Sequence, residues 1–160
     1  MAGDARAMFR VGLISDTHGL LRPEARAFLR GSDFIVHGGD IGDPAILGEL
    51  ESLAPLTAVR GNVDQGPWAE RLREREFVQV GGVLICAVHD LAQLGIEPGG
   101  AGIQVVVSGH SHKPLIEKRS GVLYVNPGSC GRRRFKLPIS VGELVVRGSS
   151  VSARLVELEA

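Results

Sequence analysis

Seven side chains of the types that bind metal ions occur in five short groups along the sequence. In Asp16-Thr17-His18, a two-residue offset in an extended segment points a carboxylate and an imidazole to the same side, so both can hold one cation. His110-Ser111-His112 repeats this geometry with two imidazoles. The complete set is Asp16, His18, Asp40, Asn62, His89, His110 and His112. Imidazole, carboxylate and amide ligands without a thiolate suit divalent metal ions.

Each group alone also has a simpler structural interpretation. Asp40 can cap a loop, Asn62 can occupy a left-handed turn, and His89 can be a hydrogen-bonded core residue. An isolated Asp-x-His triplet is more often a solvated carboxylate beside a surface histidine. A metal site is favoured because all five groups closely follow apolar runs of strand length.

These apolar runs predict buried strands that end at the metal-binding side chains. In open sheets ligands collect beyond the carboxyl ends of the strands, because loops from several strands converge there. We therefore expect the five groups to meet at one place. The predicted strands are residues 9–15, 34–36, 56–59, 83–88 and 103–107.

The remaining elements define an α/β protein. Helices are expected at residues 23–30 and 44–54, the second with Asp43 as N-cap and Pro44 at its first position, so the chain begins as βαβαβ. The second half is mostly β. It contains predicted hairpins of residues 77–80 with 83–88 and of 115–118 with 122–125, and strands at 140–147 and 151–158.

Size and charge limit the classes of function. We expect residues 1–8 to be a flexible tail and residues 9–160 to form one domain. Because 18 basic side chains balance 18 acidic ones, we expect neither extended nucleic acid nor a membrane as partner. With only Cys86 and Cys130 and no signal peptide, the chain is expected in the cytoplasm. A homo-oligomer stays open.

Taken in order, the motifs resemble the metallophosphoesterase (calcineurin-like) superfamily. Within it, the chain is similar over nearly its whole length to the small YfcE-like phosphodiesterase branch. The resemblance implies a four-layer α/β/β/α sandwich of two mixed β-sheets flanked by helices. The motifs are Asp16-x-His18, Gly39-Asp40, Gly61-Asn62-Val63-Asp64, His89, Gly109-His110-Ser111-His112 and Asn126-Pro127-Gly128-Ser129.

The resemblance also implies a dinuclear metal site that hydrolyses a small phosphate ester through a metal-bound hydroxide. It assigns one ion to Asp16, His18, Asp40 and His112, and the other to Asp40, Asn62, His89 and His110. Asp40 is then the bridge, and Asp40, Asn62 and His89 are the expected catalytic residues. We expect two divalent ions, with manganese as first choice and zinc, iron or nickel as alternatives.

Several residues near the motifs keep more than one interpretation. Larger members of the superfamily resemble Gly-Asn-His-Glu where this chain has Val63, which favours leaving groups of low pKa. His37 is either a proton donor or substrate contact or, as we favour, a residue that supports the strand end or a neighbouring ligand. Asp64 and Asp90 either orient neighbouring ligands or are surface carboxylates. A basic cluster either clamps a second phosphate or is a solvated loop or subunit contact; it contains Arg132, Arg133, Arg134 and Lys136.

A rival function comes from another class. The small subunit of retromer resembles the same fold and works by binding proteins, so an interaction module with little or no catalysis is the alternative. The presence of every expected ligand favours an enzyme.

Overall fold

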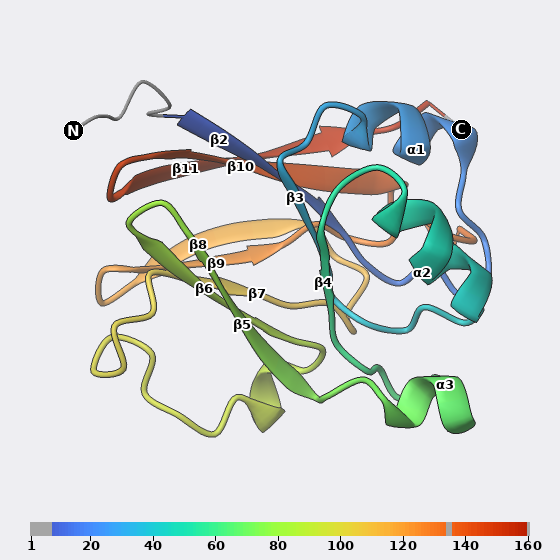
Figure 1. Cartoon of the computed structure of the whole chain (residues 1–160), viewed down its shortest axis with the longest axis horizontal. Helices are drawn as coiled ribbons and strands as arrows, with labels where there is room; N and C mark the ends of the chain where they lie inside the picture. Colours follow the sequence, from blue (N-terminus) through green and yellow to red (C-terminus); the bar gives the residue numbers. More distant parts are fainter. Residues whose placement is uncertain (1–7, 134–135, 160) are drawn as a thin grey trace.

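The computed structural model describes residues 8–133 and 136–159, and within them two five-stranded mixed sheets pack face to face (Figure 1). The fold class expected from the sequence is confirmed. The expected tail lies outside the described residues except for Met8, which begins strand β2.

The first sheet has the order β11-β10-β2-β3-β4. Its strands β2, β3 and β4 are parallel, and helices α1 (Pro23–Leu29) and α2 (Pro44–Glu51) connect them, so the predicted βαβαβ start is confirmed. Asp43 caps α2 as expected, since its carboxylate accepts a hydrogen bond from the Ala45 N–H at 2.9 Å. The strands are β2 (Met8–Ile14), β3 (Phe34–His37), β4 (Leu56–Ala58), β10 (Ser140–Arg147) and β11 (Ser150–Glu157).

The second sheet has the order β5-β6-β7-β9-β8. Both predicted hairpins are present, because β5 pairs with β6 and β8 with β9 in antiparallel register. A single helical turn, α3 (Pro67–Glu70), links the two sheets. The strands are β5 (Arg75–Val80), β6 (Val83–Val88), β7 (Val105–Val107), β8 (Leu115–Arg119) and β9 (Val122–Asn126).

Alternation along β2 explains how the layers pack. Val11 and Leu13 enter the core between the two sheets, whereas Ile14 packs with the helices on the outer face. Gly12 also faces outward, and a Cβ atom there would meet Leu29 of α1 at 2.5 Å. The missing side chain therefore lets α1 lie close against the sheet.

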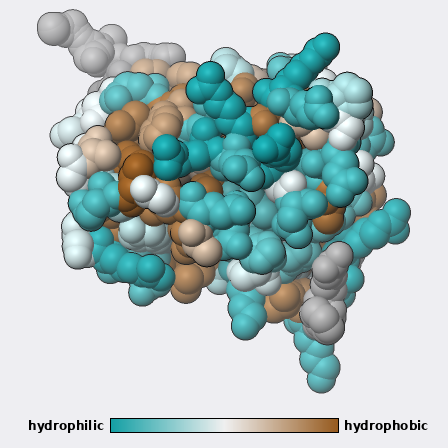
Figure 2. All heavy atoms as spheres, turned by 90° about the horizontal axis from the view of Figure 1, so that it is seen from below, coloured by the Kyte–Doolittle hydropathy of each residue, from teal (hydrophilic) through white to brown (hydrophobic). Residues whose placement is uncertain are grey.

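The outer face of the second sheet is covered by a short 3-10 helix, η1 (Leu91–Gln93), and the loop after it. Leu94 and Ile103 from this segment pack with Cys86 and Val106 of the sheet. Figure 2 views the molecule from this side and shows a mostly hydrophilic surface with hydrophobic side chains gathered in places between. This segment provides the fourth layer.

Two further features concern the chain as a whole. Within residues 8–133 and 136–159, no helix has the length and apolar character needed to cross a bilayer. Cys86 and Cys130 are both free thiols in the interior. Burial raises the pKa of Cys130 to about 12, so its thiol stays protonated.

Candidate metal centre

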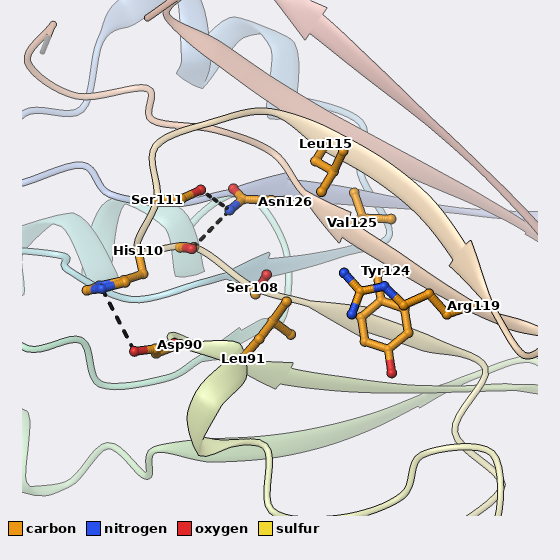
Figure 3. A pocket seen from close by; sticks show the side chains of 11 residues that line it. Asp90, Leu91, Ser108, His110, Ser111, Leu115, Arg119, Tyr124, Val125 and Asn126 are labelled. Atoms are coloured by element: carbon orange, nitrogen blue, oxygen red, sulfur yellow. Dashed lines mark hydrogen bonds and ion pairs between the residues drawn. The ribbon is translucent and has the colours of Figure 1, made fainter. Parts of the chain in front are cut away.

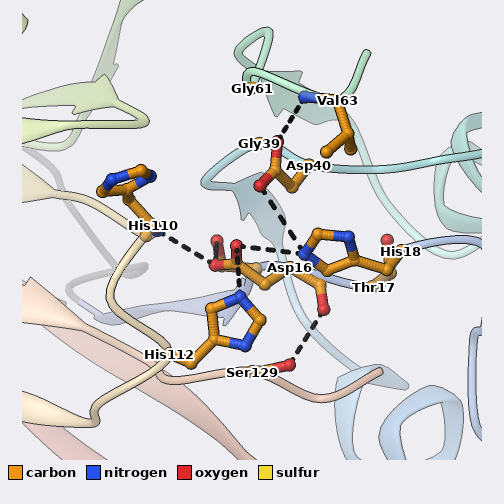
Figure 4. A network of polar contacts seen from close by, with 12 residues as sticks. Asp16, Thr17, His18, Gly39, Asp40, Gly61, Val63, His110, His112 and Ser129 are labelled. Atoms are coloured by element: carbon orange, nitrogen blue, oxygen red, sulfur yellow. Dashed lines mark hydrogen bonds and ion pairs between the residues drawn. The ribbon is translucent and has the colours of Figure 1, made fainter. Parts of the chain in front are cut away.

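The loops that follow β2 and β3 are joined by backbone hydrogen bonds, which brings their polar residues together. The Asp16 N–H donates to the Gly39 carbonyl at 2.9 Å, and the His18 N–H donates to the Asp40 carbonyl at 2.9 Å. Asp16 and His18 thus face Asp40 across two neighbouring loops (Figure 4).

A first ligand group consists of Asp16, His18 and His112, whose ligand atoms all lie within 4.8 Å of one another. Asp16 Oδ1 is 3.6 Å from His18 Nε2 and 3.4 Å from His112 Nε2. The other oxygen, Oδ2, accepts hydrogen bonds from the Ser15 hydroxyl at 2.7 Å and the His110 N–H at 3.2 Å. Asp16 is thus oriented so that Oδ1 faces the two imidazoles.

A second ligand group consists of Asp16, Asp40 and His89 and meets the same distance limit of 4.8 Å. Asp40 Oδ2 lies between two imidazoles, 3.2 Å from His89 Nε2 and 3.5 Å from His18 Nε2. Asp40 Oδ1 accepts a hydrogen bond from the Val63 N–H at 3.0 Å. His89 Nδ1 donates to the Gly38 carbonyl at 2.7 Å, which leaves Nε2 to face the centre.

The charges of this group are coupled. Burial acts to raise the pKa of Asp40, but its contact with His89 and the Val63 N–H outweigh burial and lower the pKa to about 2. Burial acts to lower the pKa of His89, but Asp40 and the Gly38 carbonyl outweigh it and raise the pKa. A cation at Asp40 and a proton on His89 would therefore compete for Nε2.

These residues fit divalent cations on two further observations. Asp16 Oδ1 and His18 Nε2 are buried and have no hydrogen-bond partner in the described part of the chain, an arrangement that is costly without a cation. Five of the predicted ligands also have left-handed backbone, with φ between 47° and 74°: Asp16, His18, Asp40, His110 and His112. Such strain in residues other than glycine gathers at functional sites.

The two other predicted ligands lie on an adjacent cleft. Asn62 and His110 line it together with His89, and its volume is about 220 Å³. The His110 imidazole belongs to neither ligand group; it is 49% exposed, with Nε2 at 3.8 Å from Asp90 Oδ2. Arg60, which the sequence analysis did not single out, lines the same cleft directly before Gly61-Asn62.

The sequence of residues 9–148 matches the calcineurin-like phosphoesterase superfamily domain. The chain belongs to this superfamily. A probable metallophosphoesterase of Methanothermobacter thermautotrophicus is 36% identical to this chain, over 91% of each chain. Phosphodiesterase MJ0936 of Methanocaldococcus jannaschii is 27% identical over 76% of this chain and 84% of its own.

The fold is also shared with a solved structure of Vps29 from Chaetomium thermophilum. The two superpose with a TM-score of 0.80 over 94% of this chain and 88% of Vps29, at 21% sequence identity. This likeness shows the fold alone.

His37 lies behind the metal-binding loops and supports them. Its Nδ1 accepts a hydrogen bond from the Gly39 N–H at 3.0 Å, so Nε2 carries the proton and donates to the Thr17 hydroxyl at 3.1 Å. That hydroxyl donates in turn to the Ile41 carbonyl at 2.8 Å. Burial lowers the pKa of His37 to about 4, so the imidazole stays neutral and braces the loops, as the favoured interpretation expected.

The other residues left open by the sequence differ in position. Asp64 is buried and binds backbone N–H groups of Asp40 and Gly61, so it orients the loops of the centre. Asp90 lies beside His110. Of the basic cluster, Arg132, Arg133 and Lys136 are exposed and do not line the cleft of Asn62 and His89, and Arg134 lies outside the described residues.

Proposed function

We propose that this chain is a phosphodiesterase that uses two divalent metal ions to hydrolyse a small phosphate ester. The observation that carries the proposal is the position of Asp40 Oδ2 between the imidazoles of His89 and His18, at 3.2 and 3.5 Å. A carboxylate between two sets of ligands is what a bridged pair of ions requires.

The proposed ligand assignment follows from this bridge. One ion is held by Asp16, His18, Asp40 and His112, and the other by Asp40, Asn62, His89 and His110. The first set has the support of the first ligand group. The second has the support of the shared cleft that Asn62, His89 and His110 line. The His110 ring already lies edge-on to the His89 ring, with centroids 5.2 Å apart, and its Nε2 would turn from Asp90 toward the ion.

Two bound divalent ions supply Lewis acidity toward phosphoryl oxygens and an activated water at neutral pH. The chain contributes two carboxylates, Asp16 and Asp40, which neutralise half of the four positive charges. Because His37 is neutral, it adds no further charge behind the site. The remaining excess favours an anionic ester. Asp40, Asn62 and His89 are proposed as the catalytic residues because they bind both ions or face the substrate cleft.

Val63 lies beside Asp40, the proposed bridging ligand, and bears on which leaving groups we expect. Val63 is 43% exposed and its side chain has no acidic proton to donate, while its backbone N–H holds Asp40 Oδ1. A leaving oxygen near Val63 receives no proton from that side chain. We therefore propose esters whose leaving groups have low pKa, and rates that fall steeply as the leaving-group pKa rises.

The native metal is proposed to be manganese, with zinc, iron or nickel as alternatives. The ligand set contains imidazoles, carboxylates and an amide, which all four ions accept, and metal availability then decides among them.

The rival proposal is a protein-interaction module of the same fold. The superposition on Vps29 supports the shared architecture only. The chain keeps every predicted ligand, and an interaction module has no need of buried polar atoms without partners such as Asp16 Oδ1. The enzyme is therefore favoured.

The test is a screen of metal-stripped protein reloaded separately with manganese, nickel and zinc. Each sample is assayed with a phosphomonoester and a phosphodiester that share the same leaving group. The proposal expects no hydrolysis before reloading, and faster turnover of the diester afterwards. Undiminished activity in the stripped protein, or no turnover with any metal, contradicts it.

A further inference from the structure

A second cleft lies between the β8–β9 hairpin and η1, next to the metal-binding loops (Figure 3). Its volume is about 160 Å³. His110 and Asp90 line this cleft and also the one that contains Asn62 and His89. The two clefts are therefore neighbours that share Asp90 and His110 as a common wall.

The walls of this second cleft are largely apolar. Leu115 on β8 and Leu91 on η1 lie on opposite sides, and the ring of Tyr124 on β9 extends the surface between them. Leu115 is 47% exposed, so a ligand that covers it removes apolar area from water. A flat apolar group is the kind of ligand that gains most from such walls.

Arg119 adds a stacking surface. Its guanidinium lies 4.8 Å from the centre of the Tyr124 ring and is held by the Glu117 carboxylate at 2.8 Å. A guanidinium that lies over a tyrosine ring can also stack on the ring of a ligand. The exposed end of the cleft thus also favours a ring.

Asn126, a polar side chain in this cleft, already has hydrogen-bond partners within the protein. The Asn126 amide donates to the Gly109 carbonyl at 2.9 Å and to the Ser111 hydroxyl at 3.2 Å, and its oxygen accepts from the Gly128 N–H at 2.9 Å. Asn126 therefore has little capacity left to read a particular pattern of donors and acceptors. Recognition by stacking tolerates many different rings.

We propose that this cleft binds an aromatic ring carried by one organic substituent of the phosphodiester. The phosphate lies at the metal-binding loops, His110 marks the junction, and the ring packs among Leu91, Leu115 and Tyr124 beside Arg119. The inference rests on the proposed function for the location of the phosphate. The ring is either a simple aryl group or a nucleobase, and the two share the same stacking chemistry.

The test measures binding rather than turnover, by calorimetry on the manganese-loaded protein. Two matched pairs of monoesters are compared: phenyl phosphate with methyl phosphate, and adenosine 5′-phosphate with ribose 5-phosphate. Each pair carries the same phosphate and differs in the ring. We expect at least one ringed ligand to bind about tenfold more tightly than its partner. The pair that shows the preference identifies the source of the ring.

Variants place the preference in this cleft. Leu115→Ala removes an exposed side chain and Tyr124→Ala removes the stacking ring, and each is expected to reduce the preference to about twofold or less. Tyr124→Phe keeps the ring and should keep the preference. Phe77→Ala is the matched control, because Phe77 is 46% exposed on β5 and does not line the cleft.

Failure of this inference can be told from failure of the proposed function. Diester hydrolysis without a ring preference, or a preference that survives both Leu115→Ala and Tyr124→Ala, contradicts ring binding in the cleft. Neither result contradicts the proposed phosphodiesterase reaction. A ring preference that depends on the cleft, in a protein that hydrolyses no diester, supports the cleft and overturns the proposed reaction. Failure of all four ligands to bind, in a protein that still hydrolyses the diester, also overturns the proposed role of the cleft.

Discussion

The carboxylate of Asp64 accepts a hydrogen bond from the backbone N–H of Asp40 at 3.0 Å. It accepts three more, from the N–H groups of Ile41 at 3.2 Å, Gly42 at 2.9 Å and Gly61 at 2.8 Å. One buried side chain thus satisfies donors from the loops after β3 and β4. These bonds hold Asp40 in its left-handed conformation, with φ of 59°.

Asp64→Asn is expected to loosen the metal centre without removing a ligand. One oxygen becomes an NH₂ group that cannot accept hydrogen bonds, so at least one backbone N–H is left without its partner. Residues that hold ligands in place typically change metal affinity by about 10–100-fold. Titration of the metal-stripped variant with manganese should show a loss of this size.

Asp43→Asn is the matched control for Asp64. Asp43 also accepts a backbone hydrogen bond, but at the exposed start of α2, where its partner is the Ala45 N–H rather than a loop of the metal centre. Asparagine is nearly as good an N-cap as aspartate. The control should keep wild-type manganese affinity, and equal affinities for both variants would contradict the role given to Asp64.

Gly61→Ala is expected to disrupt the bridge by steric conflict. A Cβ atom at Gly61 would lie 2.1 Å from Asp40 Oδ1 and 2.2 Å from Asp40 N, and the backbone atom cannot move aside cheaply. We expect a loss of about 1–3 kcal/mol in the free energy of unfolding, as for other overpacked sites. Manganese affinity should fall at least tenfold.

Gly48→Ala provides the comparison for Gly61. A Cβ atom at Gly48, inside α2, meets nothing within 4 Å. Alanine should stabilise the helix by about 0.5–1 kcal/mol and leave metal affinity unchanged. Chemical denaturation and metal titration of both variants check this, and a Gly61→Ala protein with wild-type stability and affinity would refute the steric account.

The buried, neutral His37 should make the free energy of unfolding depend on pH. Burial lowers its pKa from 6.5 to about 4 in the folded protein, so the unfolded chain binds the proton first as the pH falls. The contribution is fully present above about pH 6.5 and is lost as the pH falls to about 4. The metal-stripped protein should lose about 3 kcal/mol from this residue over that range.

His37→Gln removes the titrating group and serves as the reference. The free energy of unfolding is measured from pH 7 to pH 4 for both metal-stripped proteins. The wild type should lose more stability than the variant over this range. Parallel curves would mean that His37 is not buried in its neutral form.

The sequence predicted the position of the candidate ligands better than the contacts that orient them. Asp16, His18 and Asp40 lie just after the ends of β2 and β3, where the strand pattern predicted them, because the carboxyl ends of parallel strands share one edge and β-branched runs mark such strands plainly. Element ends were less certain. Strand β5 begins at Arg75 rather than at residue 77, since charged residues at a sheet edge weaken the alternating pattern.

Long-range contacts escaped prediction for a physical reason. The roles of Asp64 and Arg60 depend on neighbours that only the fold brings close. In the sequence, an aspartate bound to four N–H groups looks the same as an aspartate in solvent. The aromatic cleft is likewise formed only when the β8–β9 hairpin meets η1. The left-handed backbone of the ligands has no marker in residues other than glycine.

The central claim is that Asp40 joins two divalent ions in one site. The most direct measurement is the number of manganese ions bound per chain, by calorimetry and elemental analysis, in metal-stripped wild type and Asp40→Ala. We predict two ions for the wild type, and for Asp40→Ala a loss of affinity at both positions with the fold retained. A single ion in the wild type, or two ions bound by Asp40→Ala at unchanged affinity, would contradict the account.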